Sequence, residues 1–218
     1  MTSQKTRQRI LITGASSGLG AGMARAFAAE GRDLALCARR VDRLHELRDE
    51  LLDRYPGITV AVAGLDVTDH DRVIVNAGLG KGAPLGSGRP AVNRATIETN
   101  LLGALAQIEA AIEMFTSAGG GHLVLISSVL ALRGVPGVKA AYAASKAGVS
   151  SLGESLRAEY RSGPIRITVL EPGYIESEMT ARSQSTMLMV DTGTGVRAMV
   201  AAIEREVGHA VVPGWPWR

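Results

Sequence analysis

Tyr142 and Lys146, four positions apart, are the side chains of this sequence best suited to acid–base chemistry. On a helix they share a face, and an ammonium beside a phenol favours the phenolate, which lowers a phenol pKa that normally lies near 10. A tyrosine in such a place can donate or accept a proton near neutral pH. The alternative, a half-buried tyrosine with a solvated lysine, is the better interpretation of an isolated pair.

Two serines strengthen the catalytic interpretation of this pair. Ser127 and Ser128 close an apolar run at 123–126, and Ser128 lies fourteen residues before Tyr142. In open parallel sheets, ligands bind outside the carboxyl ends of the strands. A hydroxyl there can hydrogen-bond a substrate oxygen and hold it beside the tyrosine. For either serine alone, a turn that caps a strand is the plainer explanation.

A third chemical feature is the glycine-rich stretch Thr13 to Gly20, with the sequence TGASSGLG. Glycines between a strand and a helix permit a tight turn and let backbone N–H groups approach a pyrophosphate at the helix N-terminus. An ordinary glycine turn is the alternative, because this spacing differs from the common Gly-x-Gly-x-x-Gly. Its position after the first apolar run favours a nucleotide.

The elements that must position these residues follow from the apolar pattern. Continuous aliphatic runs predict buried parallel strands, and apolar residues at helical spacing predict the helices between them. The expected strands are 9–13, 34–38, 58–63, 73–75, 123–126, 165–170 and 210–212. The expected helices are 19–30, 41–54, 97–115, 142–160 and 195–206. This alternation predicts an α/β fold, a doubly wound, mostly parallel Rossmann-type sheet with helices on both faces, in one domain over 1–218.

One connection is too short for this topology. If the third strand ends near Val67 and the fourth begins at Val73, five residues join them. In the strand order 3-2-1-4, the chain must move sideways by roughly 14 Å and also return along a strand, whereas five residues reach about 20 Å. We therefore expect that a crossover helix is missing near 68–73 and that the chain lacks residues there.

Composition excludes several classes of protein. With 46% hydrophobic and 21% charged residues, the chain is not of the disordered kind. Its 24 basic residues are interleaved with 21 acidic ones, so we expect no nucleic-acid partner. No stretch predicts a membrane span, and four scattered histidines predict no metal site. A single cysteine, Cys37, indicates a reducing compartment, and we expect the cytoplasm.

Taken together, the motifs resemble those of the short-chain dehydrogenase/reductase family over about residues 9–213. The motifs that carry the resemblance are Thr13 to Gly20, Asn76-Ala77-Gly78, Asn100, Ser128, Tyr142 with Lys146, and Pro172-Gly173. Two departures are visible. Val75 stands where the family usually has an asparagine, and the interval between serine and tyrosine is one residue longer than is common.

The resemblance implies a catalytic tetrad and a nicotinamide cofactor. The tetrad would be Asn100, Ser128, Tyr142 and Lys146. The cofactor would contact Gly14, Ser16, Ser17, Gly18, Leu19, Gly20, Asp66, Val67, Asn76, Ala77, Gly78, Tyr142, Lys146, Pro172, Gly173 and Ile175.

The end of the second strand predicts which cofactor is used. NAD(H)-binding folds carry an acidic residue there that accepts hydrogen bonds from the ribose hydroxyls. Here Ala38 takes that place and Arg39 and Arg40 follow. Arginines offer a fork of donors suited to a 2′-phosphate, and cations are disfavoured at a helix N-terminus without an anion to meet. We therefore expect NADP(H) rather than NAD(H); two solvated arginines are the alternative.

The expected function is an oxidoreductase that interconverts an alcohol and a ketone or aldehyde, with Tyr142 as acid and base. The competing interpretation is a non-catalytic nucleotide sensor on the same fold, which would need the glycine turn but not Tyr142 and Lys146. Apolar residues after Pro172-Gly173, namely Met179, Met187, Leu188 and Met189, favour an apolar carbonyl substrate, and packing of a lid or of the core is the alternative. Pairing of helices 97–115 and 142–160, as the family commonly shows, predicts a homodimer or homotetramer.

Overall fold

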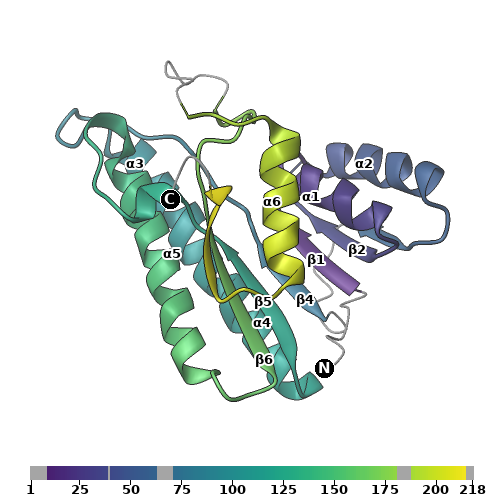
Figure 1. Ribbon diagram of the computed structural model, residues 1–218. Helices are drawn as coiled ribbons and strands as arrows, with labels where there is room; N and C mark the ends of the chain where they lie inside the picture. Colours follow the sequence, from purple (N-terminus) through teal and green to yellow (C-terminus); the bar gives the residue numbers. More distant parts are fainter. Residues whose placement is uncertain (1–8, 39, 63–70, 181–187, 215–218) are drawn as a thin grey trace.

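Parallel strands and helices alternate along the chain in the computed structural model, which describes residues 9–38, 40–62, 71–180 and 188–214 (Figure 1). The strands are β1 (Arg9–Thr13), β2 (Asp33–Cys37), β3 (Val60–Val62), β4 (Arg72–Val75), β5 (Gly121–Ile126), β6 (Ile165–Pro172) and β7 (His209–Val212). The α-helices are α1 (Gly18–Ala29), α2 (Val41–Arg54), α3 (Pro90–Ile97), α4 (Gly103–Ala118), α5 (Ala140–Glu159) and α6 (Thr192–Glu204). Short helical turns lie at Val129–Ala131 and Gly137–Lys139.

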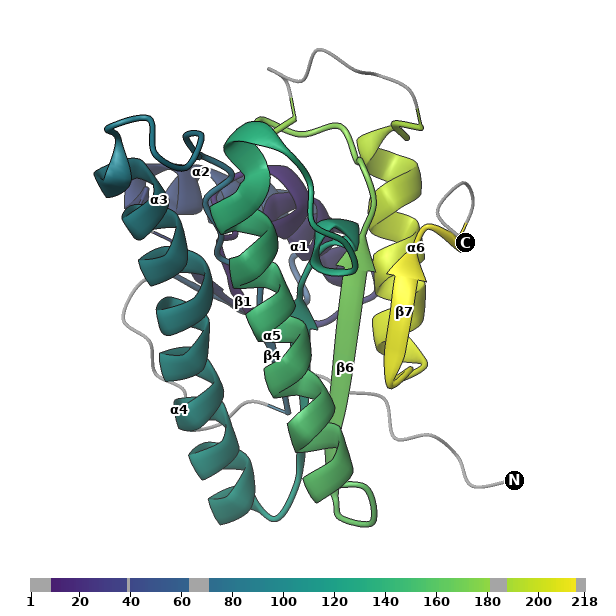
Figure 2. The same cartoon turned by 90° about the vertical axis from the view of Figure 1, so that its left-hand side faces the viewer.

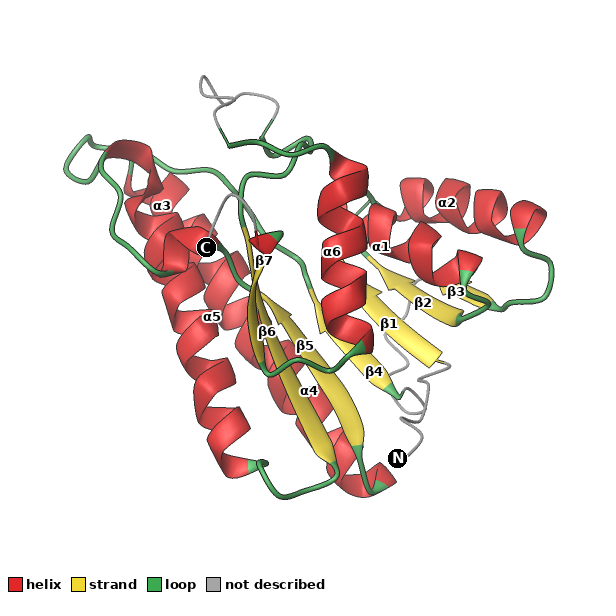
Figure 3. Cartoon of the chain, in the orientation of Figure 1, coloured by secondary structure: helices red, strands yellow, loops and turns green. Residues whose placement is uncertain are grey.

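The strands form one parallel sheet in the order β3-β2-β1-β4-β5-β6-β7, and helices cover both of its faces (Figures 2 and 3). Helices α1, α2 and α6 share one hydrophobic core with one side of the sheet, whereas α4 and α5 pack on the other side. This doubly wound, single-domain arrangement confirms the predicted Rossmann-type fold.

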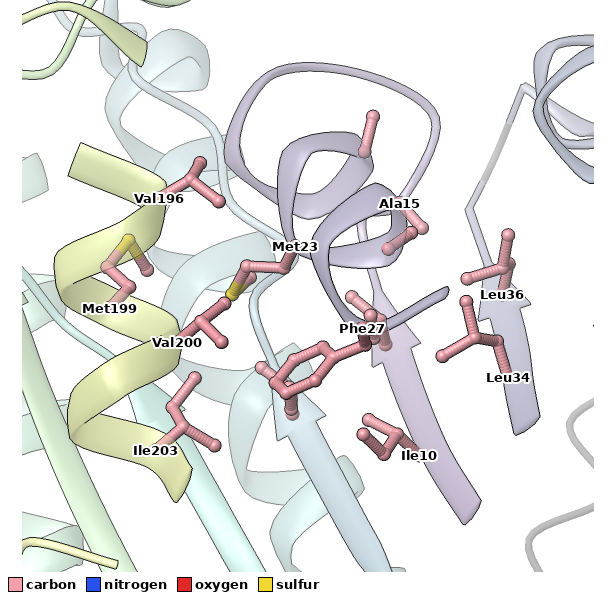
Figure 4. Packing of buried hydrophobic residues seen from close by; sticks show 14 of the residues in the cluster. Ile10, Ala15, Met23, Phe27, Leu34, Leu36, Val196, Met199, Val200 and Ile203 are labelled. Carbon is pink, nitrogen blue, oxygen red and sulfur yellow. The ribbon is translucent and has the colours of Figure 1, made fainter. Parts of the chain in front are cut away.

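Helical periodicity explains how the first core forms. In α2, Leu44, Leu47 and Leu51 are the buried positions and lie on one face of the helix. Figure 4 shows Phe27 of α1 among buried side chains of the sheet and of α6. The burial of these side chains fixes α1, and therefore the glycine-rich turn before it, against the sheet.

The long helix before β5 differs from its predicted range. It begins at Pro90 rather than near 97, because a proline is well suited to the first turn of a helix. Between α3 and α4 the backbone forms a π-helical turn, Glu98–Leu102, in which Asn100 is buried. Turns of this kind are frequent at functional sites.

The same helical stretch, Pro90–Ala118, is the one among the described residues that is long and apolar enough to cross a membrane, by length and composition only. Its α4 part packs on β4 and β5 and contributes Ile108 and Phe115 to the second core. Only 28% of its most apolar window is buried within one chain. The helix therefore serves the core of this fold and keeps an apolar surface.

The strand order places β3 and β4 on opposite sides of β2 and β1. The described strand β3 ends at Val62, earlier than predicted, and β4 begins at Arg72. Residues 63–70 lie outside the described part, so the missing helix near 68–73 stays a prediction. On the face of β2 and β3 away from α1 and α2, Ala35 and Cys37 are half-buried and Ala61 is exposed.

A buried polar network closes the amino-terminal end of the sheet, opposite the candidate site. Arg72 is 1% exposed, donates to His122 Nδ1 at 2.8 Å and pairs with Glu204 at 2.6 Å. Since Nδ1 accepts this bond, His122 Nε2 carries the proton and lies 2.8 Å from Thr168 Oγ1. His122 therefore has a structural role.

Candidate active site

The strand order reverses direction between β1 and β4, and open parallel sheets bind ligands outside the carboxyl ends of the strands at such a point. Thr13 Oγ1 accepts the backbone N–H groups of Asn76 at 2.9 Å and Ala77 at 3.1 Å. Asn76 Nδ2 donates to the Thr13 carbonyl at 3.1 Å. These bonds hold the carboxyl ends of both strands in a fixed position beside the glycine-rich turn.

Local backbone geometry explains the glycines of this turn. Gly14 and Gly18 have φ of +67° and +55°, values that L side chains rarely adopt. A Cβ at Gly20 would lie 2.3 Å from the Gly14 carbonyl oxygen, so no larger residue fits there. The side chain of Ser17 makes no capping bond, and the first turn of α1 has no acidic residue. The N–H groups at this helix end therefore suit an anion such as a pyrophosphate.

The structure distinguishes the two serines after β5. Ser127 Oγ donates to the Lys146 carbonyl at 2.9 Å and accepts from Ser150 Oγ at 2.8 Å, so it joins β5 to α5. Ser128 hydrogen-bonds the Tyr142 side chain instead, and its Oγ accepts the Leu130 N–H at 3.2 Å. Ser128 is therefore the serine placed beside the tyrosine.

Tyr142 lies in the first turns of α5 and is 9% exposed. Burial raises its pKa above the ordinary value of 10, although the hydrogen bond from Ser128 opposes this rise, and the nearby Tyr174 adds to it. The expectation that Lys146 lowers this pKa is therefore not met in the described structure. The physical reason is that desolvation of the phenolate is the largest of the contributions to this pKa.

Lys146 is 5% exposed and donates from Nζ to the Ile126 carbonyl at 2.7 Å. Burial lowers its pKa from 10.5 to about 8.

Asn100 holds the loop after β4, because its side-chain amide hydrogen-bonds the backbone N–H and carbonyl of Leu79, at 2.7 and 3.1 Å. A Cβ at Gly78 would lie 3.6 Å from both Asn100 Oδ1 and Lys146 Nζ, so glycine leaves the space between these two polar atoms open.

The predicted adenosine end of the site is only partly described. Arg40 precedes α2 and donates to Ser17 Oγ at 2.6 Å, which places its guanidinium at the glycine-rich turn. Ser16 lines a hollow between α1 and α2, and Ala38 packs on the first core. The predicted contacts Arg39, Asp66 and Val67 lie outside the described residues.

The predicted nicotinamide end follows β6. The Gly173 N–H donates to the Val212 carbonyl at 3.0 Å, which ties the end of β6 to β7. The Ile175 side chain is 3% exposed and faces Gly195 of α6, so it packs in the first core. Leu19 is partly buried against the same core.

Three residues near the site were not found from the sequence. Lys139 holds its ammonium 5.6 Å from the centre of the Tyr142 ring and donates to the Gly80 carbonyl at 3.3 Å. Its position three residues before the tyrosine could have indicated it, although Lys139 precedes α5 as its N-cap. Tyr174 and Glu178 come from the segment after β6, and no local pattern links them to the site.

The described side chains include no group of three or more His, Cys, Asp or Glu residues able to hold a metal ion.

Comparison with known proteins identifies the family. The sequence matches the model of the short chain dehydrogenases over residues 8–74 and again over 71–188. This chain belongs to the short-chain dehydrogenase family.

Curated relatives of this short-chain dehydrogenase are oxidoreductases. An uncharacterised oxidoreductase of Mycobacterium tuberculosis is 70% identical over 234 residues, which cover 100% of this chain and 92% of the relative. An uncharacterised oxidoreductase of Myxococcus xanthus is 37% identical over 227 residues, 95% of this chain and 87% of the relative. The chain is therefore an oxidoreductase of this family.

Solved structures share the fold of this short-chain dehydrogenase. A short-chain dehydrogenase from Sphingobium yanoikuyae in complex with NADPH has a TM-score of 0.82 and 28% identity, over 94% of this chain and 87% of that one. A 3-oxoacyl-[acyl-carrier protein] reductase from Brucella melitensis with bound NAD has a TM-score of 0.83 and 22% identity, over 99% and 93%. The fold thus accommodates either nucleotide, and the choice between them depends on this chain's own residues.

Proposed function

We propose that this short-chain dehydrogenase interconverts an alcohol and a ketone or aldehyde with NADP(H), and that Tyr142 transfers the proton. The observation that carries the proposal is the hydrogen-bonded pair of Ser128 and Tyr142 at the carboxyl end of β5, with Lys146 one helical turn away. A nucleotide-binding sensor would have no use for this pair. Bound NADPH supplies a hydride to the carbonyl carbon.

The residues divide the remaining work in the reductive direction. Because its pKa is raised, Tyr142 is protonated at neutral pH and can donate its proton to the carbonyl oxygen. The Ser128 hydroxyl donates a hydrogen bond to that oxygen and orients it. Lys146, with a pKa of about 8, can return a proton toward Tyr142 and regain one from a water in the space beside Gly78, which lies between its ammonium and Asn100. Asn100 keeps that space open by holding the loop after β4.

The substrate class follows from the loops after β4, β5 and β6. Large apolar side chains are exposed there, and the loops rise from the carboxyl edge of the sheet, where the site lies. They are Leu85, Leu132, Val138, Met179 and Leu188. We propose a carbonyl compound with an apolar body, because an apolar ligand would cover this surface.

A screen of ketones, aldehydes and alcohols tests the catalytic proposal. The absorbance of NADPH is followed with each acceptor, and the production of NADPH from NADP⁺ is followed with each alcohol. We expect turnover with at least one apolar pair of compounds. Tight NADPH binding without turnover on any of them would favour the sensor.

The choice of NADP(H) rests on the absence of an acid at Ala38 and on Arg40 at the glycine-rich turn. We expect Arg40→Ala to weaken NADPH binding by about ten- to a hundredfold, since a charge-assisted bond to phosphate is lost, and NADH binding far less. Arg39→Ala should act in the same direction. Calorimetric titration measures the affinity for each cofactor, and Arg48→Ala, within the helix α2 that follows Arg40, is the control.

Equal losses of affinity for the two cofactors in Arg40→Ala, or a preference of the wild-type protein for NADH, would contradict this choice.

The cytoplasm stays our proposed location, on the ground of the single cysteine.

We also propose a homodimer or homotetramer. The stretch Pro90–Ala118 keeps most of its apolar window unburied, and Leu102 is 54% exposed on it. A second copy that packs the same helices against each other would bury this surface across a two-fold axis. Light scattering at micromolar concentration should give a mass of two or four chains, and Leu102→Glu should lower it. A monomeric wild-type protein would contradict the proposal.

Finally, we propose that the chain lacks the crossover helix between β3 and β4. The family match breaks at residues 71–74, and the alignment with the Mycobacterium tuberculosis relative spans 234 positions against 218 residues here. The partly exposed Ala35, Cys37 and Ala61 occupy the sheet face that such a helix would cover. Backbone NMR assignment of this 218-residue chain should give no helical chemical shifts between Val62 and Arg72. Helical shifts over this connection would contradict the proposal.

A further inference from the structure

The segment after β6 crosses directly over the glycine-rich turn. A Cβ placed on Gly18 would lie 3.6 Å from the Cβ of Ser177, so the two backbones approach closely. Thr180 Oγ1 accepts the Ser177 N–H at 2.8 Å and lies 2.9 Å from the Ile175 carbonyl oxygen. The segment is thus an ordered turn, held by its own hydrogen bonds above the N-terminus of α1.

Glu178 projects from this turn toward the predicted adenosine end of the site. Its Oε2 accepts from Arg40 Nη1 at 3.3 Å, and its Oε1 accepts from Arg43 Nη1 at 3.2 Å. The other terminal nitrogen of Arg40 donates to Ser17 Oγ at 2.6 Å. A carboxylate therefore lies between two guanidinium groups, at the place where the proposed function needs a phosphate.

We propose that Glu178 competes with the cofactor 2′-phosphate for Arg40 and Arg43, and so limits the preference for NADPH over NADH. This inference rests on the proposed function. A phosphate cannot share the two arginines with a carboxylate, because the two anions repel each other at this distance. Glu178 must therefore leave when the 2′-phosphate binds.

Binding of NADH does not require Glu178 to leave the two arginines. A ribose 2′-hydroxyl is uncharged and can donate a hydrogen bond to the carboxylate, as it does to the acid that NAD-binding folds carry at the end of the second strand. This chain has Ala38 at that position. Glu178 instead brings an acid to the side chain of Arg40, two residues beyond Ala38, from a segment 138 residues away. The sequence around β2 alone overstates the preference for NADPH.

The energetics permit this exchange. The side chains of Arg40, Arg43 and Glu178 are 43%, 49% and 55% exposed, and ion pairs at such sites are weak. The protein can therefore release Glu178 when a ligand with a stronger charge arrives. Loss of two weak pairs corresponds to a change of about three- to tenfold in affinity.

Titration of wild-type protein, Glu178→Gln and Glu176→Gln with NADPH and NADH tests the proposal. Glu176 is exposed on the same segment, and its replacement removes the same charge. We expect Glu178→Gln to bind NADPH about three- to tenfold more tightly and NADH no more tightly than the wild type. Glu176→Gln should retain both wild-type affinities. The fragments 2′,5′-ADP and 5′-AMP should reproduce the contrast, because they carry only the adenosine end.

An unchanged NADPH affinity in Glu178→Gln overturns the proposal, and so does an equal gain in Glu176→Gln, which would indicate a general charge effect. If the wild type prefers NADPH while Glu178→Gln gains nothing, the role of Glu178 fails and the proposed function stands. If the wild type binds neither nucleotide, both fail. Circular dichroism establishes that each variant is folded, and Glu178→Ala repeats the test with a second side chain.

Discussion

Replacement of Tyr142 by phenylalanine should lower turnover by about 10²- to 10⁴-fold, the range that a positioned general acid contributes. NADPH affinity should change little, because the substitution removes one hydroxyl and keeps the buried ring. Stopped-flow measurement of NADPH oxidation, with calorimetric titration of the cofactor, separates the two effects. A loss of binding as large as the loss of turnover would contradict a role in proton transfer.

Tyr160→Phe is the matched control for this variant. Tyr160 lies at the other end of the same helix from Tyr142 and packs on the second core. Its hydroxyl has no part in the proposed reaction, so the control should keep wild-type turnover. Retention of most activity in Tyr142→Phe would remove that residue from the mechanism.

Burial of Lys146 should make stability depend on alkaline pH. Its pKa in the folded protein, about 8, lies below the unfolded value of 10.5, so the unfolded state binds more protons between these values. The free energy of unfolding therefore rises with pH across that window, and the cost of burying the charge, about 3 kcal/mol, is fully present below pH 8.

Urea denaturation of the wild type and of Lys146→Met at several pH values measures this effect. We expect the stability of the wild type to approach, or to rise above, that of the variant as pH increases from 8 to 10.5. The other titratable groups are the same in both proteins. The difference between the two free energies of unfolding therefore reports on Lys146 alone. Stability curves that stay parallel over this window would show that the ammonium is not desolvated.

Apolar periodicity predicted most of the fold, since burial on a sheet or helix face leaves a regular pattern. Helix α2 has its predicted bounds, because Leu44, Leu47 and Leu51 mark its buried face. The π-helical turn around Asn100 could not be predicted, because the same apolar spacing fits an uninterrupted α-helix. The connection before β4 showed a conflict between sequence length and topology. The described ends of β3 at Val62 and β4 at Arg72 leave nine residues between the strands, more than the five expected but still fewer than the dozen that a parallel crossover needs.

The site was predicted in part for a similar reason. Sequence spacing places Tyr142 and Lys146 on one helix face, but it does not give their burial, and burial controls both pKa values. The resemblance had favoured Ser128 over Ser127, and the bond from Ser127 to the α5 backbone gives the physical reason. Contacts between distant segments, such as Glu178 with Arg40, leave no local pattern in the sequence.

The most direct test of the central claim is deuterium transfer from NADPH that carries deuterium at both C4 positions. A carbonyl acceptor found in the screen is incubated with this cofactor and the enzyme, and the product is analysed by mass spectrometry and NMR. We predict an alcohol with deuterium on its carbinol carbon, formed by the wild type and nearly absent with Tyr142→Phe. An alcohol without deuterium at that carbon, or equal transfer by the two proteins, would contradict the account.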